Sequence, residues 1–511
     1  MDRRMFLKLN MLSLASITSL YAMKDHSNHK MNNINNFNNI NTSFINLENP
    51  NIKLLQEKYF PKNEKLQKLK LLENKSKKRG FFKSIIEIKE SEIEIIKGKK
   101  TKIFTYNGLT PGPKIEVYEG DTVEILVKNN LNEPTTIHWH GLDIPPEQDG
   151  NPHDPIMPKQ ERIYKFKIKE GSAGTYWYHP HPHYITSKQV YKGLAGVFVV
   201  KAKQDALSHL KEQDWMISDL RLDENAQIPD NNLFDWLNGR EGEFVLINGQ
   251  FKPKITINQE QRIRIYNSCS ARYLNLHIKD AEFILVGTDG GLIEKPVKMQ
   301  NLFLAPASRV EVIIKANKGE FKLESLYYNR DKMMVKEKPK NIFLANIKIE
   351  ETINNIPEKL RTINSLDKAT SFKKIIFSED HMKMHNISKK TSEEIKQNLA
   401  SMFLINGNVF DMHRIDLISK IGEIEEWTII NDSHMDHNFH IHGTQFELIS
   451  STINNKTIKP NFKALQDTIN IKPKEIIKLK MVQNFTGIRM FHCHILEHED
   501  LGMMGILKIE N

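Results

Sequence analysis

The sequence predicts an all-β protein built from three related domains. From about residue 83 onward, apolar and polar residues alternate in short runs such as Ile85-Ile86-Glu87-Ile88, which is typical of half-buried strands. A block consisting of an Asn-Gly turn, two strands and a closing asparagine then occurs three times. The copies begin about 140 to 160 residues apart, which is the size of one domain. Many short alternating strands of this kind indicate sandwiches or barrels.

The blocks also set the expected domain boundaries. The closing asparagines are Asn129, Asn267 and Asn431. We expect domains at residues 51–202, 203–355 and 356–511. Helical patterns are few, and Thr391 to Leu399 is the clearest short example.

The first 22 residues have the features of an export signal. Arg3-Arg4-Met5-Phe6-Leu7-Lys8 precedes an apolar run from Leu9 to Ala22 that is too short to span a bilayer as a helix. The paired arginines followed by Phe-Leu-Lys resemble a twin-arginine signal, although a general secretory signal has a similar positive start. No later segment reaches 18 apolar residues. We therefore expect cleavage near Ala22 and a periplasmic protein without a membrane anchor.

The next segment is expected to contribute little to the fold. Residues 23–50 are rich in asparagine, a composition typical of a disordered linker. His26, His29 and Met31 in this segment could hold metal loosely, but a plain tether is the favoured interpretation. Residues 51–80 are lysine-rich with leucines at helical spacing, and they predict a lead-in to the first domain.

Composition narrows the class of protein. With 511 residues, 39% of them hydrophobic and 27% charged, the chain is too long for one core and fits a globular protein of several domains. The net charge of +10 comes from scattered lysines without an arginine-rich patch, so nucleic-acid binding is not expected. Two cysteines cannot make a disulfide framework: either Cys269 pairs with Cys493 or each has its own role. Cys269 has no motif around it and is expected to be a small buried hydrophobe.

Eight of the 20 histidines form four His-x-His pairs, two in the first expected domain and two in the third. In a strand, both imidazoles of such a pair point to the same face. Packing the two domains together would gather eight imidazoles, which suits a cluster of three copper ions. The pairs are His138/His140, His179/His181, His440/His442 and His492/His494. The middle domain has no pair, and its His277 is expected to be an ordinary histidine.

A second ligand set surrounds Cys493. In a strand, Cys493 faces away from its neighbours His492 and His494, so this tripeptide can contact two metal sites at once. Other potential ligands close to it in sequence are His437, His498 and Met503. A thiolate with two imidazoles and a weak thioether is the ligand set of a blue-copper electron-transfer site. The alternative for this segment alone is a buried structural cysteine among surface histidines.

Together, these motifs resemble the four copper-binding motifs of the multicopper oxidases. His-Trp-His-Gly, His-Pro-His, His-x-x-His-x-His and His-Cys-His-x3-His-x4-Met are all present, and the match covers the chain from about residue 85 to the end. Within that family, the sequences at 442–446 and 496–504 are most similar to the bacterial periplasmic copper-tolerance (cuprous) oxidases. The resemblance implies three cupredoxin-like Greek-key β-sandwich domains with few short helices.

The resemblance also implies four copper ions and their ligands. Type 1 copper would be held by His437, Cys493, His498 and axial Met503. Type 2 copper would be held by His138 and His440. The type 3 pair would be held by His140, His179, His181, His442, His492 and His494. Every position is filled, unlike in relatives that keep the fold, lose the ligands and act as structural proteins.

The implied reaction couples one-electron oxidation of a substrate to four-electron reduction of O2 to water. Cys493 would carry electrons from the type 1 copper to the cluster. Asp149 and Glu499 match family acids that supply protons near the cluster. Their alternatives are a turn residue before Gly150 and an exposed strand charge, respectively.

The substrate is expected to be Cu(I). Met435 matches a soft ligand position beside the type 1 site, with Asp432 and Asp436 nearby, although Ser433 stands where the family has an acid. Thioethers select Cu(I), so the short Met-rich segment at 381–385 could also contact substrate copper. Its methionines are Met382 and Met384.

Several alternatives stay open at this stage. Met333-Met334 is interpreted as core padding. A laccase-like phenol oxidase and a ferroxidase would use the same coppers, and a non-catalytic copper-binding or structural protein is the alternative of another class. The expected partners are O2 and Cu(I) or another small reductant, and the protein is expected to be a monomer that binds no nucleic acid.

Overall fold

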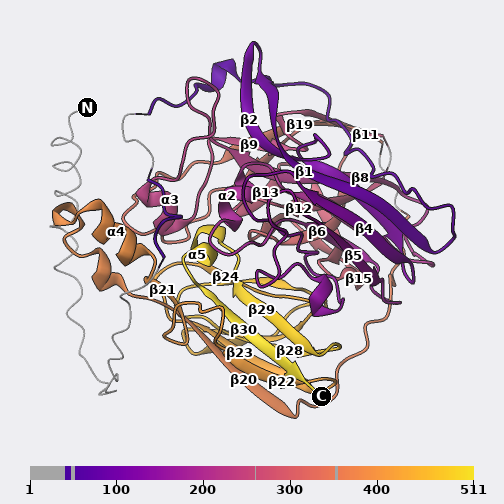
Figure 1. Cartoon of the computed structure of the whole chain (residues 1–511). Helices are drawn as coiled ribbons and strands as arrows, with labels where there is room; N and C mark the ends of the chain where they lie inside the picture. Colours follow the sequence, from indigo (N-terminus) through magenta and orange to yellow (C-terminus); the bar gives the residue numbers. More distant parts are fainter. Residues whose placement is uncertain (1–40, 48–51, 259, 352–354) are drawn as a thin grey trace.

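The computed structural model describes residues 41–47, 52–258, 260–351 and 355–511 (Figure 1). The expected signal at residues 1–22 and most of the expected linker at 23–50 lie outside the described residues. Within the described part, the strands form six sheets and the helices are short, so the predicted all-β fold is confirmed. No helix of the described part is long and apolar enough to cross a membrane.

The first sheet pair arises from strands in which alternate residues are apolar. In β4, Val123, Ile125 and Val127 are buried while the residues between them are half-buried, so one face of the strand forms core. Two sheets, ordered β2-β1-β4-β5 and β3-β7-β6, share this core. The strands are β1 (Phe81–Ile96), β2 (Lys99–Tyr106), β3 (Gly112–Tyr118), β4 (Thr122–Asn129), β5 (Glu161–Lys167), β6 (Gly174–Tyr178) and β7 (Gly196–Lys201).

The middle sheet pair consists of a seven-stranded sheet, β10-β9-β8-β12-β17-β14-β15, and a five-stranded sheet, β11-β19-β18-β13-β16, around one aliphatic core. Its central strand β12 is buried along its whole length, and Arg262 and Arg264 on this strand both pair with Glu311. The strands are β8 (Lys211–Leu220), β9 (Phe244–Ile247), β10 (Gln250–Phe251), β11 (Lys254–Asn258), β12 (Gln261–Asn267), β13 (Leu274–Ile278), β14 (Glu282–Thr288), β15 (Gly291–Met299), β16 (Asn301–Leu304), β17 (Arg309–Lys315), β18 (Gly319–Ser325) and β19 (Ile342–Glu351).

The third sheet pair has a six-stranded sheet, β21-β20-β23-β28-β25-β26, and a five-stranded sheet, β22-β30-β29-β24-β27. In Figure 1 it forms the orange-to-yellow part of the molecule below the indigo first pair. The strands are β20 (Ser371–Glu379), β21 (Phe403–Ile405), β22 (Leu417–Lys420), β23 (Ile424–Asn431), β24 (His437–Ile441), β25 (Glu447–Ile453), β26 (Lys456–Ile458), β27 (Thr468–Ile471), β28 (Ile476–Val482), β29 (Gly487–Cys493) and β30 (Met504–Glu510).

The three sheet pairs repeat one another. Each contains two parallel strand pairings in equivalent places: β1·β4 and β3·β7, β8·β12 and β11·β19, β20·β23 and β22·β30. The three closing asparagines also act alike, because Asn129, Asn267 and Asn431 each donate two side-chain hydrogen bonds to backbone carbonyls. The repeat seen in the sequence is therefore a repeat in structure. The domain boundaries at 51–202, 203–355 and 356–511 stay a prediction.

Helices are few among the described residues, as predicted, and those given below belong to that part of the chain. Thr391 caps α4 with its side chain, so the helix lies where the sequence indicated. Residues 52–80 differ from the helical spacing of their leucines: apart from one 3-10 turn they form no helix, because their backbone pairs with neighbouring strands instead. The helices are α2 (Thr186–Tyr191), α3 (Leu233–Asn238), α4 (Ser392–Leu399) and α5 (Leu496–Asp500), and the 3-10 turns are η1 (Glu57–Tyr59), η2 (Pro146–Gln148), η3 (His381–Met384) and η4 (Ile387–Lys389).

The end of the Asn-rich segment is packed, in contrast to its predicted disorder. Within residues 41–47, Ile45 is fully buried and Phe44 stacks on Tyr184 with ring centroids 4.7 Å apart. The indole of Trp236 donates a hydrogen bond to the backbone oxygen of Asn46 over 2.9 Å. Two large apolar side chains anchor this end, a local feature that overall composition does not capture.

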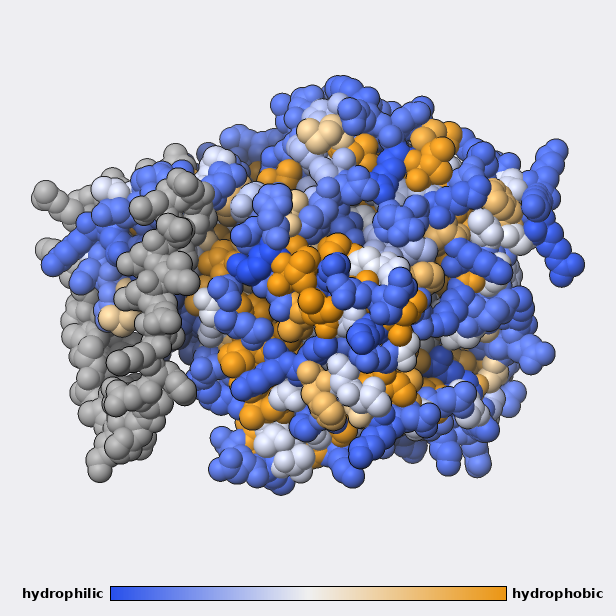
Figure 2. Space-filling model, turned by 60° about the horizontal axis from the view of Figure 1, so that its bottom comes forward, coloured by the Kyte–Doolittle hydropathy of each residue, from blue (hydrophilic) through white to orange (hydrophobic). Residues whose placement is uncertain are grey.

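The two cysteines are both free and buried, so no disulfide joins them. Burial raises the pKa of the Cys269 thiol, which therefore behaves as the small buried hydrophobe that was predicted. At the surface, the face shown in Figure 2 is mostly hydrophilic, and hydrophobic residues occur in groups separated by hydrophilic ones. The scattered lysines therefore contribute to a solvated surface.

Candidate metal centres

Strand pairing brings the histidine pairs together. In the third sheet pair, β24 and β29 are antiparallel with His440 opposite His492 and Phe439 opposite Cys493. In the first sheet pair, His138 and His179 face each other in an isolated antiparallel bridge. The first and third sheet pairs therefore each contribute four imidazoles, and in each of them strand or bridge pairing brings two His-x-His motifs side by side.

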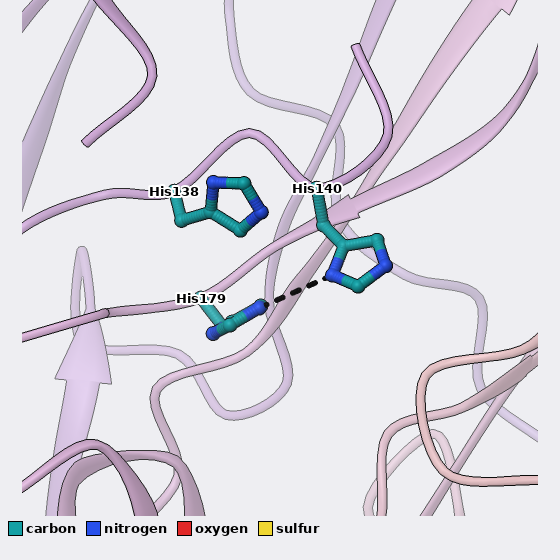
Figure 3. Close-up of side chains that lie close together, drawn as sticks. All are labelled: His138, His140 and His179. Atoms are coloured by element: carbon teal, nitrogen blue, oxygen red, sulfur yellow. Dashed lines mark hydrogen bonds between the residues drawn. The ribbon is translucent and has the colours of Figure 1, made fainter. Parts of the chain in front are cut away.

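The eight imidazoles of the His-x-His pairs meet at the interface of the first and third sheet pairs, and all of them are fully buried. The Nε2 atom of His492 lies 3.2 Å from Nε2 of both His181 and His442. The Nε2 atoms of His138 and His440 are 3.4 Å apart, and so are His140 Nδ1 and His179 Nε2 (Figure 3). Two imidazole nitrogens about 2.0 Å from one shared ion would lie about 3.3–3.5 Å apart, so these separations fit metal binding.

The protonation of these rings also fits metal binding. Burial lowers the pKa of seven of these histidines, to about 3 for His492 and to well below the usual range for His140, His179, His181, His440, His442 and His494, so these seven rings are neutral. In four rings, Nδ1 lies about 3 Å from a backbone carbonyl, which can only accept, so Nδ1 donates and Nε2 is left free. These rings belong to His138, His179, His440 and His492. Both ring nitrogens of His494 are buried without a hydrogen-bond partner, as expected where a metal would supply one.

Cys493 has its own set of neighbours. His437 Nδ1 lies 3.4 Å from Cys493 Sγ, and ligand atoms of His437, Cys493 and His498 lie within 4.8 Å of one another. The Nε2 atom of His498 donates to the Leu237 carbonyl, which leaves its Nδ1 without a partner. Met503 is fully buried in the same core cluster as Cys493. A thiolate, two imidazoles and a thioether fit a single copper ion.

The tripeptide at residues 492–494 contacts both centres. His492 points to His181 and His442, and the His494 ring lies 5.1 Å from the His140 ring, whereas Cys493 points to His437 on the other side of the strand. The alternation expected from the sequence is therefore realised here.

The position of Glu499 excludes one of the two interpretations made from the sequence. It lies on α5 with an exposed fraction of 1%, so the reading as an exposed strand charge is wrong. Its carboxyl oxygens lie 3.5 Å from His181 Nε2 and 3.2 Å from His492 Nδ1. Burial and, to a smaller extent, the neighbouring Asp500 raise the pKa of Glu499 well above its usual range, so it holds a proton beside the cluster.

Asp149 lies in the expected turn and also close to the histidine cluster; its role as a family acid stays a prediction. It follows the 3-10 turn η2 directly and precedes Gly150, which has a φ of +76°. Its fully buried carboxylate lies 3.2 Å from His138 Nδ1 and 3.3 Å from His442 Nδ1. The turn thus brings this carboxylate to one histidine of each flanking sheet pair.

Sequence reasoning missed two acids. Asp467, just before β27, lies 3.0 Å from His140 Nε2 and accepts a hydrogen bond from His440 Nδ1 at its backbone oxygen. Glu379, the last residue of β20, lies 3.1 Å from His437 Nε2. Neither is part of a histidine motif. The only local signal is the position of Glu379 two residues before the Met-rich segment.

Glu379 also connects His437 to two partly exposed imidazoles. Its side chain is fully buried and lies 2.5 Å from His434 Nδ1 and 3.6 Å from His381 Nε2. The side chains of His434 and His381 are 33% and 50% exposed. Burial by itself would raise the pKa of Glu379, but His434 and His437 outweigh this effect and lower it, so the group is a carboxylate.

The other candidate contacts for substrate copper are scattered. Met435 is fully buried in the core, and buried Asp436 accepts hydrogen bonds from Tyr328 and Asn470. Exposed Asp432 pairs with Lys474 at 2.6 Å. In the Met-rich segment, Met382 is 72% exposed, whereas Met384 is buried in the core. Between β18 and β19, Met333 is buried and Met334 is 44% exposed, so the interpretation as core padding is correct for Met333 alone.

His277 of the middle sheet pair is half-buried, and its Nδ1 atom forms a hydrogen bond with the Asn301 side chain, as expected of an ordinary histidine.

Comparisons with known proteins agree with this geometry. Sequence models of multicopper oxidase domains match residues 87–205, 210–342 and 378–511. A solved multicopper oxidase from Campylobacter jejuni, described as a metallo-oxidase, is 64% identical and superposes with a TM-score of 0.91 over 92% of this chain and 100% of its own.

More distant relatives include both oxidases and a protein named for cell division. The multicopper oxidase mco of Staphylococcus aureus is 32% identical over 458 residues, which is 86% of this chain and 91% of the relative. The cell division protein FtsP of Photorhabdus laumondii is 29% identical over 421 residues, covering 80% of this chain and 85% of the relative.

Proposed function

The chain belongs to the multicopper oxidase family, and we propose that its substrate is Cu(I) and that it protects the periplasm from copper. Such an oxidase takes one electron from each substrate ion and passes four to O2. The balance is four Cu(I), one O2 and four protons giving four Cu(II) and two water molecules. The leader-like residues 1–22 support export by a twin-arginine signal.

Family members bind four copper ions, and we assign their ligands from the convergence of side chains described above. When bound, these ions take up the electrons and supply the place where O2 is reduced. Proposed type 1 ligands are His437, Cys493, His498 and Met503. Proposed type 2 ligands are His138 and His440, and proposed type 3 ligands are His140, His179, His181, His442, His492 and His494. Cys493 provides the covalent connection between the two centres.

Two acids complete the proposed machinery. Glu499 keeps a proton within about 3.5 Å of two ligand imidazoles, which suits a proton donor for O2 reduction. Asp149 orients His138 and His442 from the other side.

The observation that carries the choice of a metal substrate is the connection through Glu379. A cation held by His434 and His381 would be one carboxylate away from His437, a proposed type 1 ligand. A phenol needs an apolar cleft, whereas these side chains offer imidazole nitrogens and a negative charge. Met382, on the same 3-10 turn as His381, adds an exposed thioether, and thioethers select Cu(I).

The two buried candidates, Met435 and Asp436, are not proposed to contact substrate copper directly. Met435 and Asp436 are too enclosed to meet an ion from solvent. We therefore propose direct contact with substrate copper for His434, His381 and Met382.

Steady-state O2 uptake with Cu(I), Fe(II) and a phenol tests the proposal. His434→Ala should lower kcat/KM for Cu(I) by about tenfold, equivalent to about 1.4 kcal/mol, while the rate with the phenol and the blue absorption stay unchanged. His413→Ala is the matched control, because His413 is an exposed histidine of the same sheet pair.

The other outcomes distinguish the alternatives. Fast phenol turnover that exceeds Cu(I) turnover would indicate a laccase, and a preference for Fe(II) would indicate a ferroxidase. No O2 uptake and no blue band after copper loading would indicate a non-catalytic role, although the full set of ligand side chains speaks against it.

A further inference from the structure

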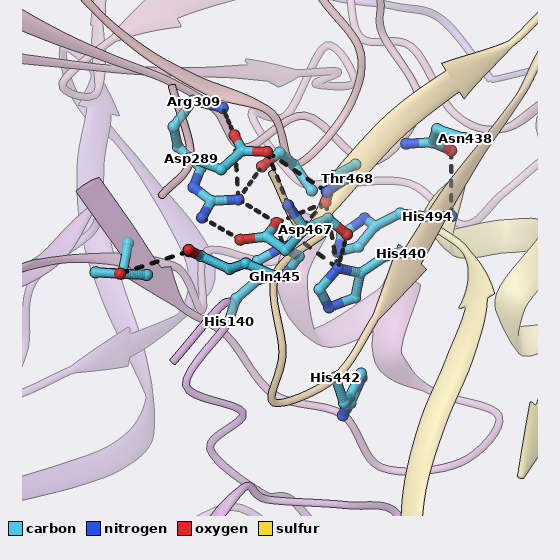
Figure 4. Close-up of polar contacts among 12 residues, drawn as sticks. His140, Asp289, Arg309, Asn438, His440, His442, Gln445, Asp467, Thr468 and His494 are labelled. Atoms are coloured by element: carbon cyan, nitrogen blue, oxygen red, sulfur yellow. Dashed lines mark hydrogen bonds and ion pairs between the residues drawn. The ribbon is translucent and has the colours of Figure 1, made fainter. Parts of the chain in front are cut away.

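A buried ion pair connects the middle sheet pair to the histidine cluster. Arg309 is the first residue of β17, and Asp289 lies in the turn between β14 and β15. Asp467 lies just before β27 of the third sheet pair. Their exposed fractions are 1% or less. The middle sheet pair, which contributes no proposed copper ligand, therefore reaches the cluster through these residues (Figure 4).

Arg309 contacts all three sheet pairs at once. Its Nη1 and Nη2 atoms each lie 2.6 Å from one carboxylate oxygen of Asp467, a bidentate arrangement. Its Nε donates to the Thr175 carbonyl on β6 over 2.9 Å. The Asp289 carboxylate accepts hydrogen bonds from the backbone amides of Arg309 and Asp467 over 2.7 and 3.2 Å, and so holds these two backbone segments together.

Asp467, held by Arg309 and Asp289, in turn contacts two imidazoles of the cluster. Its carboxylate contacts His140 from the first sheet pair, and its carbonyl contacts His440 from the third. These two rings stack with centroids 3.8 Å apart. The space is tightly filled, since a Cβ atom on Gly141 would lie 2.3 Å from an Asp467 oxygen. A shift of Asp467 would therefore rotate or separate both rings.

A stabilising role alone does not explain this network. Replacing both partners of a buried ion pair by apolar residues often costs little stability, because desolvation offsets the attraction between the charges. A bidentate pair does, however, fix position and orientation. Residues that orient metal-binding imidazoles in this way typically change metal affinity by about 10- to 100-fold when replaced.

We propose that Arg309 and Asp289 are positioning residues that hold Asp467 against His440, a proposed type 2 ligand, and His140, a proposed type 3 ligand, and so set the copper affinity of this part of the cluster. This inference rests on the proposed ligand assignment and is independent of the substrate. It gives the middle sheet pair a specific role: it sets the geometry of a metal site to which it supplies no ligand.

The test is retention of copper against a chelator, without any substrate. Copper per chain, the type 2 EPR signal and the blue band are measured after dialysis at increasing chelator concentration. Arg309→Leu should lose the type 2 signal at about 10- to 100-fold lower chelator concentration, with the blue band kept. Asp289→Asn should show a smaller shift in the same direction, and Arg309→Lys should restore part of the loss.

Arg264→Leu is the matched control. Arg264 is also fully buried in the middle sheet pair and contacts Thr175 and Glu311, but it does not contact the histidine cluster. It should lower the unfolding temperature of the copper-free protein while retaining the type 2 signal. If Arg309→Leu fails to fold, Arg309→Lys and Asp289→Asn give the same comparison.

Two results would overturn the inference: wild-type retention in the Arg309 and Asp289 variants, or equal loss in the Arg264 variant. Absence of a type 2 signal from the unaltered protein would overturn the ligand assignment and this inference together. A failure of the Cu(I) preference would leave the retention measurement unaffected, so the two failures are distinguishable.

Discussion

The middle sheet pair and the two flanking sheet pairs use their buried polar positions differently. In the middle pair, buried arginines are matched by acids, as in Arg262 and Arg264 with Glu311. In the flanking pairs, the buried polar groups at the common interface are mainly neutral imidazoles with unused nitrogen atoms. These buried charges of the middle pair are therefore paired with one another, whereas imidazoles at the interface of the flanking pairs keep nitrogen atoms that could bind metal.

This difference indicates a division of labour among three repeats of one architecture. The flanking pairs carry the proposed chemistry, and the middle pair keeps them in place through contacts such as Arg309 with Asp467. Changes in the flanking pairs should therefore alter turnover and spectra. Changes in the middle pair that leave Arg309 and Asp289 in place should alter stability alone.

The largest contrast is expected between the two cysteines. Cys493→Ser should abolish the blue band and turnover, because a serine hydroxyl does not replace a copper-binding thiolate. Cys269→Ser in the middle sheet pair should keep both and cost stability on the order of 1 kcal/mol. Absorption spectra and O2 uptake of the two variants provide the measurement. A blue band in Cys493→Ser, or its loss in Cys269→Ser, would contradict this division.

The next largest effect is expected on α5, where two buried acids differ in what they contact. Glu499→Gln should slow reoxidation of the reduced enzyme by O2 about 100-fold, because its proton is lost from beside His181 and His492. Anaerobic reduction of the blue band should be unchanged. Glu497→Gln is the control, since Glu497 is equally buried on the same helix, whereas the distances to His181 and His492 are those of Glu499. Stopped-flow absorption separates the two half-reactions, and equal slowing in both variants would argue against a specific role for Glu499.

The sequence predicted those parts of the site that follow from local periodicity. His440, His492 and Cys493 lie in strands, where the two-residue period assigned their faces before the structure. The other histidines of the pairs lie in isolated bridges or within two residues of a bridge or strand, so the expected strand pairs are realised only in part. The asparagine-closed repeat similarly indicated three equivalent units. Residues such as Asp467 and Arg309 could not be found this way, because each is a single residue that only the packing of two sheet pairs brings to the cluster.

Burial of single side chains also escaped prediction. Met435 matched a substrate-binding position by spacing, but the hydrogen bonds of Asn431 to the Met435 and Ile471 carbonyls hold this loop against the core. Glu379 was overlooked because a lone glutamate at a strand end has no pattern. Long-range contacts, which spacing does not encode, decide both cases.

Copper removal should lower stability by less than the two preceding substitutions change activity, and it should loosen the flanking sheet pairs more than the middle one. A site filled at 100 times its Kd contributes about 2.7 kcal/mol, so chelation should lower the unfolding temperature. Hydrogen exchange should increase in the segments around residues 138–140, 437–442 and 492–503, whereas β12 and β17 of the middle pair should stay protected. Exchange monitored by mass spectrometry before and after chelation gives the comparison. Equal loss of protection in β12 would show that the middle pair also depends on metal.

The smallest effect is expected from acid on the charge network of the middle pair. Arg264, Lys201 and Arg262 outweigh burial and lower the pKa of Glu212 to about 2 from an ordinary value near 4.5. Because the folded state holds the carboxylate more strongly than the unfolded state, its stabilisation is complete above about pH 4.5 and is lost as the pH falls towards 2. Glu212→Gln should therefore be less stable than the unaltered protein by about 1–3 kcal/mol at pH 6, and the gap should close on acidification. Exposed Glu320→Gln on β18 should show no such gap. Thermal unfolding of the copper-free proteins between pH 6 and 3 measures this, and a gap that widens with acid would show that Glu212 is not held as a carboxylate.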